Sequence, residues 1–478
     1  MLFSFFFLVL TMLNPLGAQE CPDMTGRVIL PHDKDYDDAR SVSNYFYSKD
    51  SFPKAVVYCR TAEDVQNAVK WARCEGLGIR IRSGGHHHEG FSTGSDVLVI
   101  DVSEMKKMEL DKEKGIAQLE PGITGGELYT ALFKEGYTQV GGTCADVGIS
   151  GLVLTGGMGP LARVHGLTCD SLLSFEMVDA EGNLLIATKD NEHADLFWAA
   201  CGGGGGNFGI VTSLALKVYP AQNVTWFNIG WDWSQPIDKI IAAWQDFFYL
   251  KDDRRWFSHL DVWAKAFPVA QFQKQPIKAM GVFYGTPEQA KQELAPLLAV
   301  ATPASQMIEE VQWRKALQLF EDSTAVFVTD KPEYKSTGSF VMEPLPKEAI
   351  QIIIETLKNS KAPLLNVLFL GLGGAVADKD PSATAYYYRG AKSLAVYSTQ
   401  WLSPDLAKAQ NEEVDALREK LLPYTQGDYV GNPDRKLKDY LSSYWGGNVQ
   451  RLREVKKKYD PNNVFNFPQS IPPFEGKK

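Results

Sequence analysis

Residues 79–92 read IRIRSGGHHHEGFS, and residues 141–172 read GGTCADVGISGLVLTGGMGPLARVHGLTCDSL. In the first stretch an alternating strand pattern runs directly into a pair of glycines. Glycine pairs in such a place let backbone N–H groups approach a ligand that a Cβ atom would exclude, as a pyrophosphate requires. His86 and Cys144 stand beside these two glycine-rich loops. Both side chains are nucleophiles, so both could reach the same bound molecule.

Both stretches resemble the FAD-binding domain of the vanillyl-alcohol oxidase superfamily, in its berberine-bridge-enzyme-like branch. The branch carries R-S-G-G-H-x-x-x-G and a longer pattern that begins G-x-C-x-x-V-G and ends R-x-x-G-L-x-x-D. They match Arg82 to Gly90 and Gly142 to Asp170 nearly position for position. Residues 195–212 resemble the end of the same domain, and residues 444–471 resemble the branch's C-terminal tail. Four ordered blocks that span nearly the whole mature chain argue against chance similarity.

The resemblance implies an α+β fold in which a two-subdomain PCMH-type FAD-binding domain is joined to an antiparallel-sheet substrate domain. We expect the FAD-binding domain at 50–220, the substrate domain at 221–403, and a C-terminal segment, 404–478, that completes the FAD-binding domain. The middle segment mixes aromatic strands such as 226–231 with longer helices such as 347–359.

Local patterns in the first domain predict alternating strands and helices. Residues 54–58, 79–82 and 96–101 are expected to be strands. Thr61 is expected to cap a helix that keeps one apolar face at helical spacing, formed by Val65, Ala68, Val69 and Ala72.

The composition argues for a soluble globular protein. The chain of 478 residues exceeds one typical domain, and 44% hydrophobic and 22% charged residues are ordinary values. A net charge of −9 argues against a nucleic-acid surface. Residues 1–18 are an apolar run ending in small residues, which predicts a cleaved secretory signal, although the positive n-region is missing and another kind of leader is the alternative. We therefore expect a secreted or periplasmic monomer without a membrane segment.

Six cysteines are compatible with disulfides in an exported protein. We expect Cys59 to pair with Cys74 or Cys21, while the connectivity stays open. The chain has no C-x-x-C spacing, which argues against zinc.

The three consecutive histidines, His86, His87 and His88, have two readings. Successive side chains of an extended segment alternate, so only His86 and His88 could share a metal, and only Glu89 could join them; we expect no metal site. The resemblance implies instead that His86 is bonded to the 8α-methyl group of the flavin. It also implies a second, 6-S-cysteinyl bond at Cys144, and hence bicovalent FAD.

Further roles follow from the resemblance. Val147 matches the position that gates oxygen beside the flavin, where valine goes with oxidases and isoleucine with dehydrogenases. Arg163 and Asp170 are expected to fix the fold. The other residues expected to bind FAD are Arg82, Ser83, Gly84, Gly85, Gly90, Gly148, Gly151, Gly156, Gly157, Gly159, Asn207, Gly209, Ile210 and Val211.

The chain departs from its relatives at the acid–base residues. Many oxidases of the branch carry a tyrosine where this chain has Asn432, and a tyrosine or aspartate where it has Leu372. An asparagine cannot act as a base. Tyr429, Tyr388 and Tyr397 are the replacement candidates, with Tyr429 and Tyr397 taken as the predicted catalytic residues.

Three functions remain in competition. The leading hypothesis is an exported FAD-dependent oxidase that takes a hydride from an alcohol, an oligosaccharide or an aromatic metabolite and passes electrons to molecular oxygen, which gives hydrogen peroxide. The alternatives are a dehydrogenase or oxidative cyclase with the same flavin, and a flavin-loaded binding protein without turnover.

Overall fold

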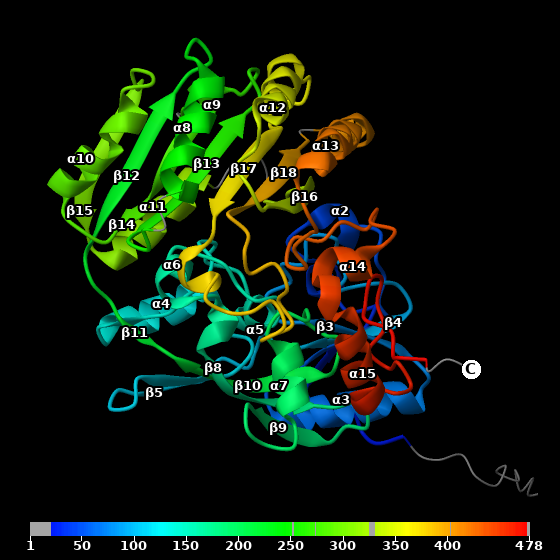
Figure 1. The fold of residues 1–478 in the computed structure, drawn as a ribbon. Helices are drawn as coiled ribbons and strands as arrows, with labels where there is room; N and C mark the ends of the chain where they lie inside the picture. Colours follow the sequence, from blue (N-terminus) through cyan, green and yellow to red (C-terminus); the bar gives the residue numbers. More distant parts are fainter. Residues whose placement is uncertain (1–20, 251–252, 273, 325–329, 402, 476–478) are drawn as a thin grey trace, which may run out of the picture.

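The computed structural model describes residues 21–250, 253–272, 274–324, 330–401 and 403–475. Its strands gather in two regions, one below and one above the middle of the molecule in Figure 1, and helices cover both. The predicted α+β class is confirmed. The predicted signal peptide at 1–18 lies outside the described residues. Within the described ranges, no helix is both long and apolar enough to cross a membrane.

The first small sheet has a parallel core that ends at the glycine pair. Strands β2 (Ala55–Tyr58), β4 (Val97–Asp101) and β3 (Gly78–Arg82) run parallel, and β1 (Arg27–Ile29) pairs antiparallel with β2. Helix α3 (Ala62–Cys74) leads from β2 to β3; Thr61 caps it by accepting a hydrogen bond from Asp64 N. Its predicted apolar face is fully buried, so the predicted strand–helix–strand unit is confirmed. The order across the sheet is β1, β2, β4 and β3.

The second small sheet is antiparallel and carries the other glycine-rich loops. Helices α4 (Gly125–Lys134), α5 (Ile149–Leu154), α6 (Ala162–His165) and α7 (Ala194–Ala200) accompany it, and a two-stranded ribbon of β7 (Tyr137–Thr138) and β11 (Tyr219–Pro220) is nearby. The strand order is β5 (Met108–Asp111), β6 (Ile116–Leu119), β10 (Ile210–Lys217), β8 (Leu172–Val178) and β9 (Leu184–Thr188).

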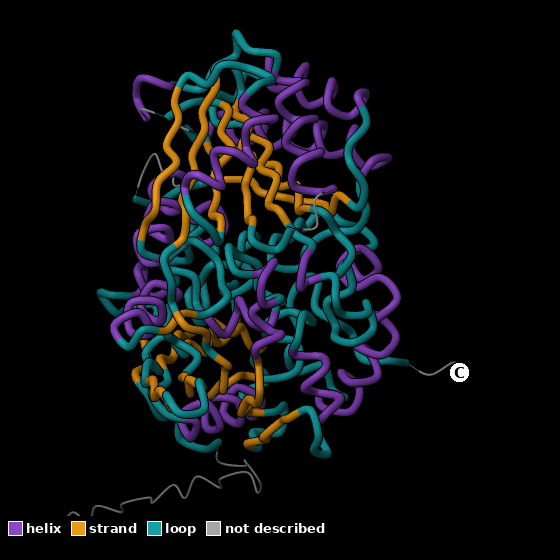
Figure 2. Tube along the Cα trace, turned by 60° about the vertical axis from the view of Figure 1, so that its left-hand side comes forward, coloured by secondary structure: helices purple, strands orange, loops and turns teal. Residues whose placement is uncertain are grey.

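The large sheet forms the upper half of the molecule and is antiparallel throughout (Figure 2). Its strand order is β15 (Ser305–Val311), β12 (Val224–Trp231), β14 (Ile277–Phe283), β13 (Trp256–Trp263), β17 (Asn366–Gly371), β18 (Ser393–Gln400) and β16 (Tyr334–Val341). The predicted aromatic strand and the predicted helix at 347–359 are both present.

Side chains of β12 point alternately to the two faces of this sheet and pack into two different cores. Phe227, Ile229 and Trp231 pack into one core with four helices, whereas Trp226 packs on the opposite face with α11 (Trp313–Thr324). Trp226, Trp231 and Trp256 are fully buried, so these aromatic side chains form core. The four helices are α8 (Ile237–Leu250), α10 (Pro287–Leu298), α12 (Lys347–Asn359) and α13 (Ala407–Leu421).

Helix α13 belongs to the large sheet's layer, since it packs against β16 and β18. The following helices, α14 (Tyr440–Trp445) and α15 (Val449–Tyr459), lie on the lower half of the molecule, with α15 against α7 (Figure 1). The chain therefore returns to the first domain after α13. This differs from the predicted boundary at 404, because the apolar residues of α13 complete the core of the upper layer.

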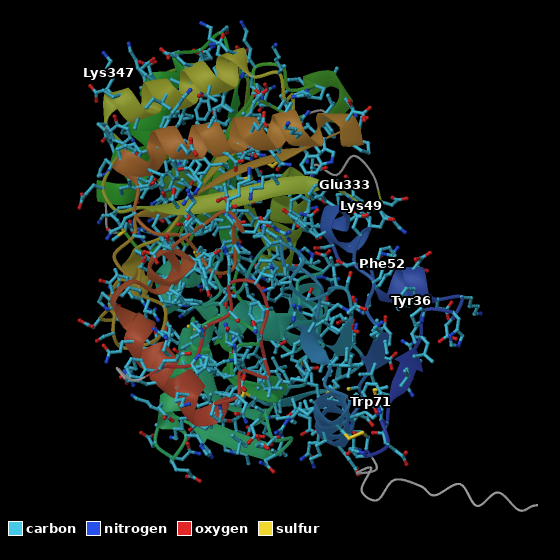
Figure 3. All side chains as sticks on the ribbon, turned by 90° about the vertical axis from the view of Figure 1, so that its right-hand side faces the viewer. Tyr36, Lys49, Phe52, Trp71, Glu333 and Lys347 are labelled. Atoms are coloured by element: carbon cyan, nitrogen blue, oxygen red, sulfur yellow. A yellow bond between two sulfur atoms is a disulfide. The ribbon has the colours of Figure 1, made fainter. Side chains whose placement is uncertain are left out.

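The N-terminal segment also touches the upper layer. In Figure 3, Lys49 follows the short helix α2 (Tyr45–Ser48) and faces Glu333, which precedes β16. Lys49 Nζ lies 2.9 Å from Glu333 Oε1, and Tyr45 N donates to Pro332 O. These two contacts join segments that lie almost three hundred residues apart in sequence.

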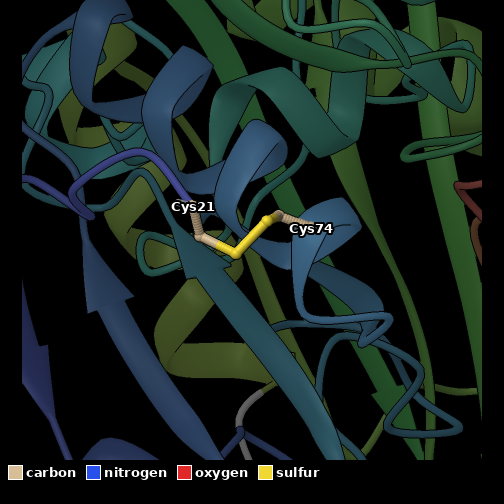
Figure 4. The surroundings of a disulfide bond; sticks show 2 residues. All are labelled: Cys21 and Cys74. Atoms are coloured by element: carbon tan, nitrogen blue, oxygen red, sulfur yellow. A yellow bond between two sulfur atoms is a disulfide. The ribbon is translucent and has the colours of Figure 1, made fainter. Parts of the chain in front are cut away.

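A disulfide joins Cys21 to Cys74, the last residue of α3 (Figure 4). The predicted pairing of Cys59 with Cys21 or Cys74 is wrong. Cys59 follows β2 and is fully buried in the apolar core under α3, whereas Cys74 is exposed at the helix end. Cys59, Cys144, Cys169 and Cys201 are free thiols.

Candidate cofactor site

A cavity of ≈280 Å³ lies where loops of both small sheets meet the C-terminal segment. Its lining comes from residues 79–92, 147–155, 204–211, 429–433 and 465–469, together with Val102 and Tyr444. Most of the predicted site residues line it, namely Ser83, Gly84, Gly85, His86, Val147, Gly148, Gly151, Asn207, Gly209, Ile210, Val211 and Tyr429.

The two glycine-rich loops pack backbone against backbone at Gly84 and Gly148. A Cβ on Gly84 would lie 2.3 Å from Gly148 N, and a Cβ on Gly148 would lie 2.3 Å from Ser83 Oγ. No side chain fits at either position. The contact brings the loop of His86 against the loop of Cys144.

Two other glycines border open space. A Cβ on Gly151 would meet no protein atom within 4 Å, and a Cβ on Gly205 would meet only Leu154, at 3.9 Å. Both residues line the cavity. A side chain at either position would project into space that a ligand could use, which fits the predicted approach of backbone to a flat, phosphate-bearing molecule.

Several predicted cofactor residues do not line the cavity but support the loops that do. A Cβ on Gly157 would lie 2.2 Å from Thr168 Oγ1, and one on Gly159 only 1.6 Å from Gly141 O. Gly156 (φ +107°) and Gly90 (φ +66°) have backbone angles that L-residues rarely adopt. These four glycines allow tight packing within the protein.

Arg82 is likewise a supporting residue. Its guanidinium is paired with the carboxylate of Asp101 at the ends of the adjacent strands β3 and β4, and both side chains are buried. Asp101 also accepts a hydrogen bond from Ser103 N. The pair fixes the strand end from which the glycine pair departs.

The three histidines have three different partners. His86 Nε2 lies 2.8 Å from Asp146 Oδ2, and this contact holds the pKa of Asp146 below its usual value. His87 Nδ1 accepts from Glu89 N and Phe91 N. His88 Nδ1 lies 2.6 Å from Asn432 Oδ1. Over the described residues, no cluster of three or more His, Cys, Asp or Glu side chains could hold a metal ion.

Cys144 lies outside the cavity lining but is exposed, unlike the other free cysteines. It stands two residues before Asp146, the partner of His86. Surrounding protein atoms raise the pKa of the Cys144 thiol to about 11. Its loop contacts the loop of His86, so the two residues that the resemblance assigns to flavin attachment lie on adjacent loops.

The two predicted tyrosines differ in position. Tyr429 lines the cavity, and its hydroxyl is 3.1 Å from Thr155 Oγ1 and accepts from Gly157 N at 3.3 Å. Burial raises the pKa of Tyr429 to about 12. Tyr397 is fully buried in the core of the large sheet, with its hydroxyl 3.1 Å from Ser339 Oγ, and does not line the cavity. The geometry favours a structural role for both over the predicted role as base.

The C-terminal segment contributes cavity residues that we did not single out from the sequence: Tyr444, Phe465, Phe467 and Gln469. All four lie in the tail block that resembles the family, so the signal was present in that block. Asn207 fastens the tail, because its Oδ1 accepts from Ile471 N and its backbone oxygen accepts from Lys456 Nζ.

Asp170 joins the first domain to the loop before β18. Its carboxylate, on a side chain that is 3% exposed, accepts from Arg389 at 2.7 and 3.0 Å, from Lys379 Nζ at 2.8 Å and from Leu167 N. Burial alone would raise the pKa of Asp170, but these cations hold it below its usual value. Arg163 donates to Leu372 O and thus spans the same junction. These contacts agree with the expectation that both residues fix the fold.

Comparisons with known proteins agree with this geometry. Residues 53–188 match the model of an FAD binding domain, and residues 428–472 match the family described as berberine and berberine like. The chain is 40% identical to the uncharacterized FAD-linked oxidoreductase YgaK of Bacillus subtilis (strain 168), over 94% of this chain and 97% of that protein. It is 30% identical to berberine bridge enzyme-like 17 of Arabidopsis thaliana, over 88% and 85% of the two chains.

Two solved structures have the same fold. Physcomitrella patens BBE-like 1 superposes with a TM-score of 0.86 at 26% identity, covering 95% of this chain and 98% of that one. A chitooligosaccharide oxidase superposes with a TM-score of 0.83 at 25% identity, covering 94% and 98%.

Proposed function

Because the chain belongs to the berberine-bridge-enzyme-like FAD-linked oxidoreductases, we propose that it is an exported oxidase with bicovalently attached FAD. The observation that carries the proposal is the contact between the His86 and Cys144 loops at the wall of one cavity. The substrate would be an alcohol, an oligosaccharide or an aromatic metabolite, and molecular oxygen would be the second substrate. The protein would act as a secreted or periplasmic monomer.

The chain's own residues divide the work of holding the cofactor. His86 and Cys144 would form the two bonds, and Gly151 and Gly205 would let backbone approach the flat ligand. The stretch from Asn207 to Val211 would meet the adenine end. When bound, the flavin accepts a hydride from the substrate and returns its electrons to oxygen.

A dehydrogenase, an oxidative cyclase and a flavin-loaded binder remain the alternatives. The binder is motivated by Leu372 and Asn432, which stand where related oxidases carry acid–base residues. A donor screen separates them: an oxidase bleaches its flavin with one donor class and releases peroxide in air. Bleaching without peroxide would identify a dehydrogenase, and no bleaching with any donor class would favour the binder.

Val147 provides a test of the oxygen reaction. It lines the cavity on the loop that packs against the His86 loop. Val147→Ile adds one methylene where oxygen would have to approach, and close-packed sites tolerate such additions poorly. We expect slower reoxidation by air with flavin reduction by substrate little changed, measured by stopped-flow absorbance. Val147→Ala is the matched control, and equal reoxidation in wild type and Val147→Ile would contradict the gate.

A further inference from the structure

His88 stands apart from the other two histidines of its loop because its ring contacts the side-chain amide of a distant segment, that of Asn432. His86 contacts Asp146 through Nε2, and His87 accepts a hydrogen bond at Nδ1 from a backbone N–H of its own loop. His88 lines the cavity and binds Asn432 through Nδ1. Within the described part of the chain, Nε2 of His88 has no hydrogen-bond partner.

The partner of Nδ1 fixes the tautomer of His88. The Oδ1 atom of Asn432 also accepts a hydrogen bond from Ser336 Oγ, at 2.9 Å. In the orientation that the Asn432 amide has in the structure, its oxygen faces Nδ1, which places the proton of the neutral ring on Nδ1 and the lone pair on Nε2. A neutral imidazole whose other nitrogen is oriented by a neighbour has the form of a general base.

Residues from the N-terminal segment, the large sheet and the C-terminal segment together hold His88 in place. Asn432 comes from the C-terminal segment and Ser336 from β16 of the large sheet. Asn44, fully buried, donates its Nδ2 to both His88 O and Tyr334 O, at 2.8 and 2.9 Å. The ring of Tyr334 packs edge-on against His88, with centroids 5.6 Å apart. The ring orientation is therefore defined before any substrate binds.

The electrostatic surroundings keep the ring uncharged at neutral pH. Burial, and next the proximity of His86, lower the pKa of His88 to about 4. Glu89 acts in the opposite direction, and Lys335 of β16 acts in the same direction as burial. Glu89 forms ion pairs with Lys335 and Arg435, and Lys335 forms a second ion pair with Asp434.

We propose that His88 is the catalytic base, and that Asn432 and Ser336 are positioning residues that hold its Nε2 for the substrate. The proposal rests on the proposed function. The substrate O–H or N–H bond breaks and an Nε2–H bond forms, while the adjacent C–H bond gives its hydrogen and electron pair to the bound flavin. The substrate thus loses two hydrogens and becomes a carbonyl or imine, and the imidazolium then returns its proton to water.

The first test needs no substrate and is independent of the proposed function. We would record the ¹⁵N resonances of the holoenzyme's imidazoles between pH 3 and 8, and assign His88 with the His88→Gln variant. The expected result is a neutral ring protonated at Nδ1 and, in Asn432→Asp, a raised pKa, because a carboxylate would then face Nδ1. A ring protonated at Nε2 would overturn the proposal, since its lone pair would face Asn432.

The second test measures flavin reduction with a donor found in the screen. His88→Gln keeps a polar side chain but removes the base, and should slow reduction about 10²–10⁴-fold, the usual contribution of a general base. Imidazole in the buffer should restore part of the rate in His88→Gly. In Asn432→Asp the acid limb of the pH profile should move to higher pH, which a purely structural role of Asn432 would not cause.

His193→Gln is the matched control. His193 Nδ1 also lies 2.9 Å from a side-chain oxygen, that of Tyr459, but the residue does not line the cavity, so the rate should not change. Reduction of His88→Gln at the wild-type rate would remove His88 from the reaction while the oxidase proposal stands. If no donor bleaches the flavin of the wild type, the proposed function fails, and the tautomer result still decides the orientation of His88.

Discussion

The double variant His86→Ala/Cys144→Ala is expected to release all of its FAD when the protein is precipitated with acid. Wild-type protein should give a yellow pellet, because covalent bonds survive unfolding while the noncovalent contacts of the cavity do not. Each single variant should keep one bond and therefore a coloured pellet. The absorbance of pellet and supernatant at the flavin band measures the distribution.

The absorbance of the folded double variant before precipitation provides the control. Cys144 is exposed and His86 borders the cavity, so alanine at these positions removes little packing from the hydrophobic core. A folded, yellow double variant that loses its colour only in acid separates loss of attachment from loss of binding. Flavin remaining in the acid pellet of the double variant would show that attachment uses another residue.

Asp170→Asn is expected to lower the free energy of unfolding by about 3–5 kcal/mol, the usual cost of removing one partner from a buried ion pair. The amide would leave Arg389, which is 1% exposed at its side chain, with an uncompensated charge. Urea unfolding followed by tryptophan fluorescence measures the loss. Asp378→Asn is the matched control, because its pair with Arg254 is exposed and such pairs contribute about 0–1 kcal/mol.

The effect of Asp170 should depend on pH in one direction. Its pKa is lowered in the folded protein, so the stabilisation is fully present above the unfolded carboxyl pKa of about 4 and is lost as pH falls through the folded value. Wild type and Asp170→Asn should therefore approach each other in stability at acidic pH. A difference that stays constant between pH 7 and pH 3 would contradict the role of the charge.

The glycine-rich loops could be predicted from the sequence because a close backbone contact requires glycine itself. The contact of Gly84 with Gly148 leaves no room for a side chain, so only glycine fits at both positions. The sequence did not distinguish glycines that face the cavity from glycines such as Gly157 and Gly159 that face the protein. That distinction depends on which side of the loop Thr168 and Gly141 occupy, and it arises only in the folded chain.

The remaining differences are long-range. Cys59 is close in sequence to Cys74 but lies beneath the helix whose far end carries Cys74. Tyr397 lies in an ordinary strand sequence, which does not show whether its side chain faces a cavity or the core. The helices that cover the large sheet bury it in the core. The contact of His88 with Asn432 joins residues 344 positions apart, which no local pattern records.

The tail's place in the cavity wall has a consequence for how the pocket is assembled. Phe465, Phe467 and Gln469 lie almost four hundred residues after Ser83 in sequence, yet they line the same cavity. The pocket is therefore complete only once this distant segment has packed against the loops of the two small sheets. We expect the flavin to bind after that long-range packing, rather than to serve as a template around which the first domain folds.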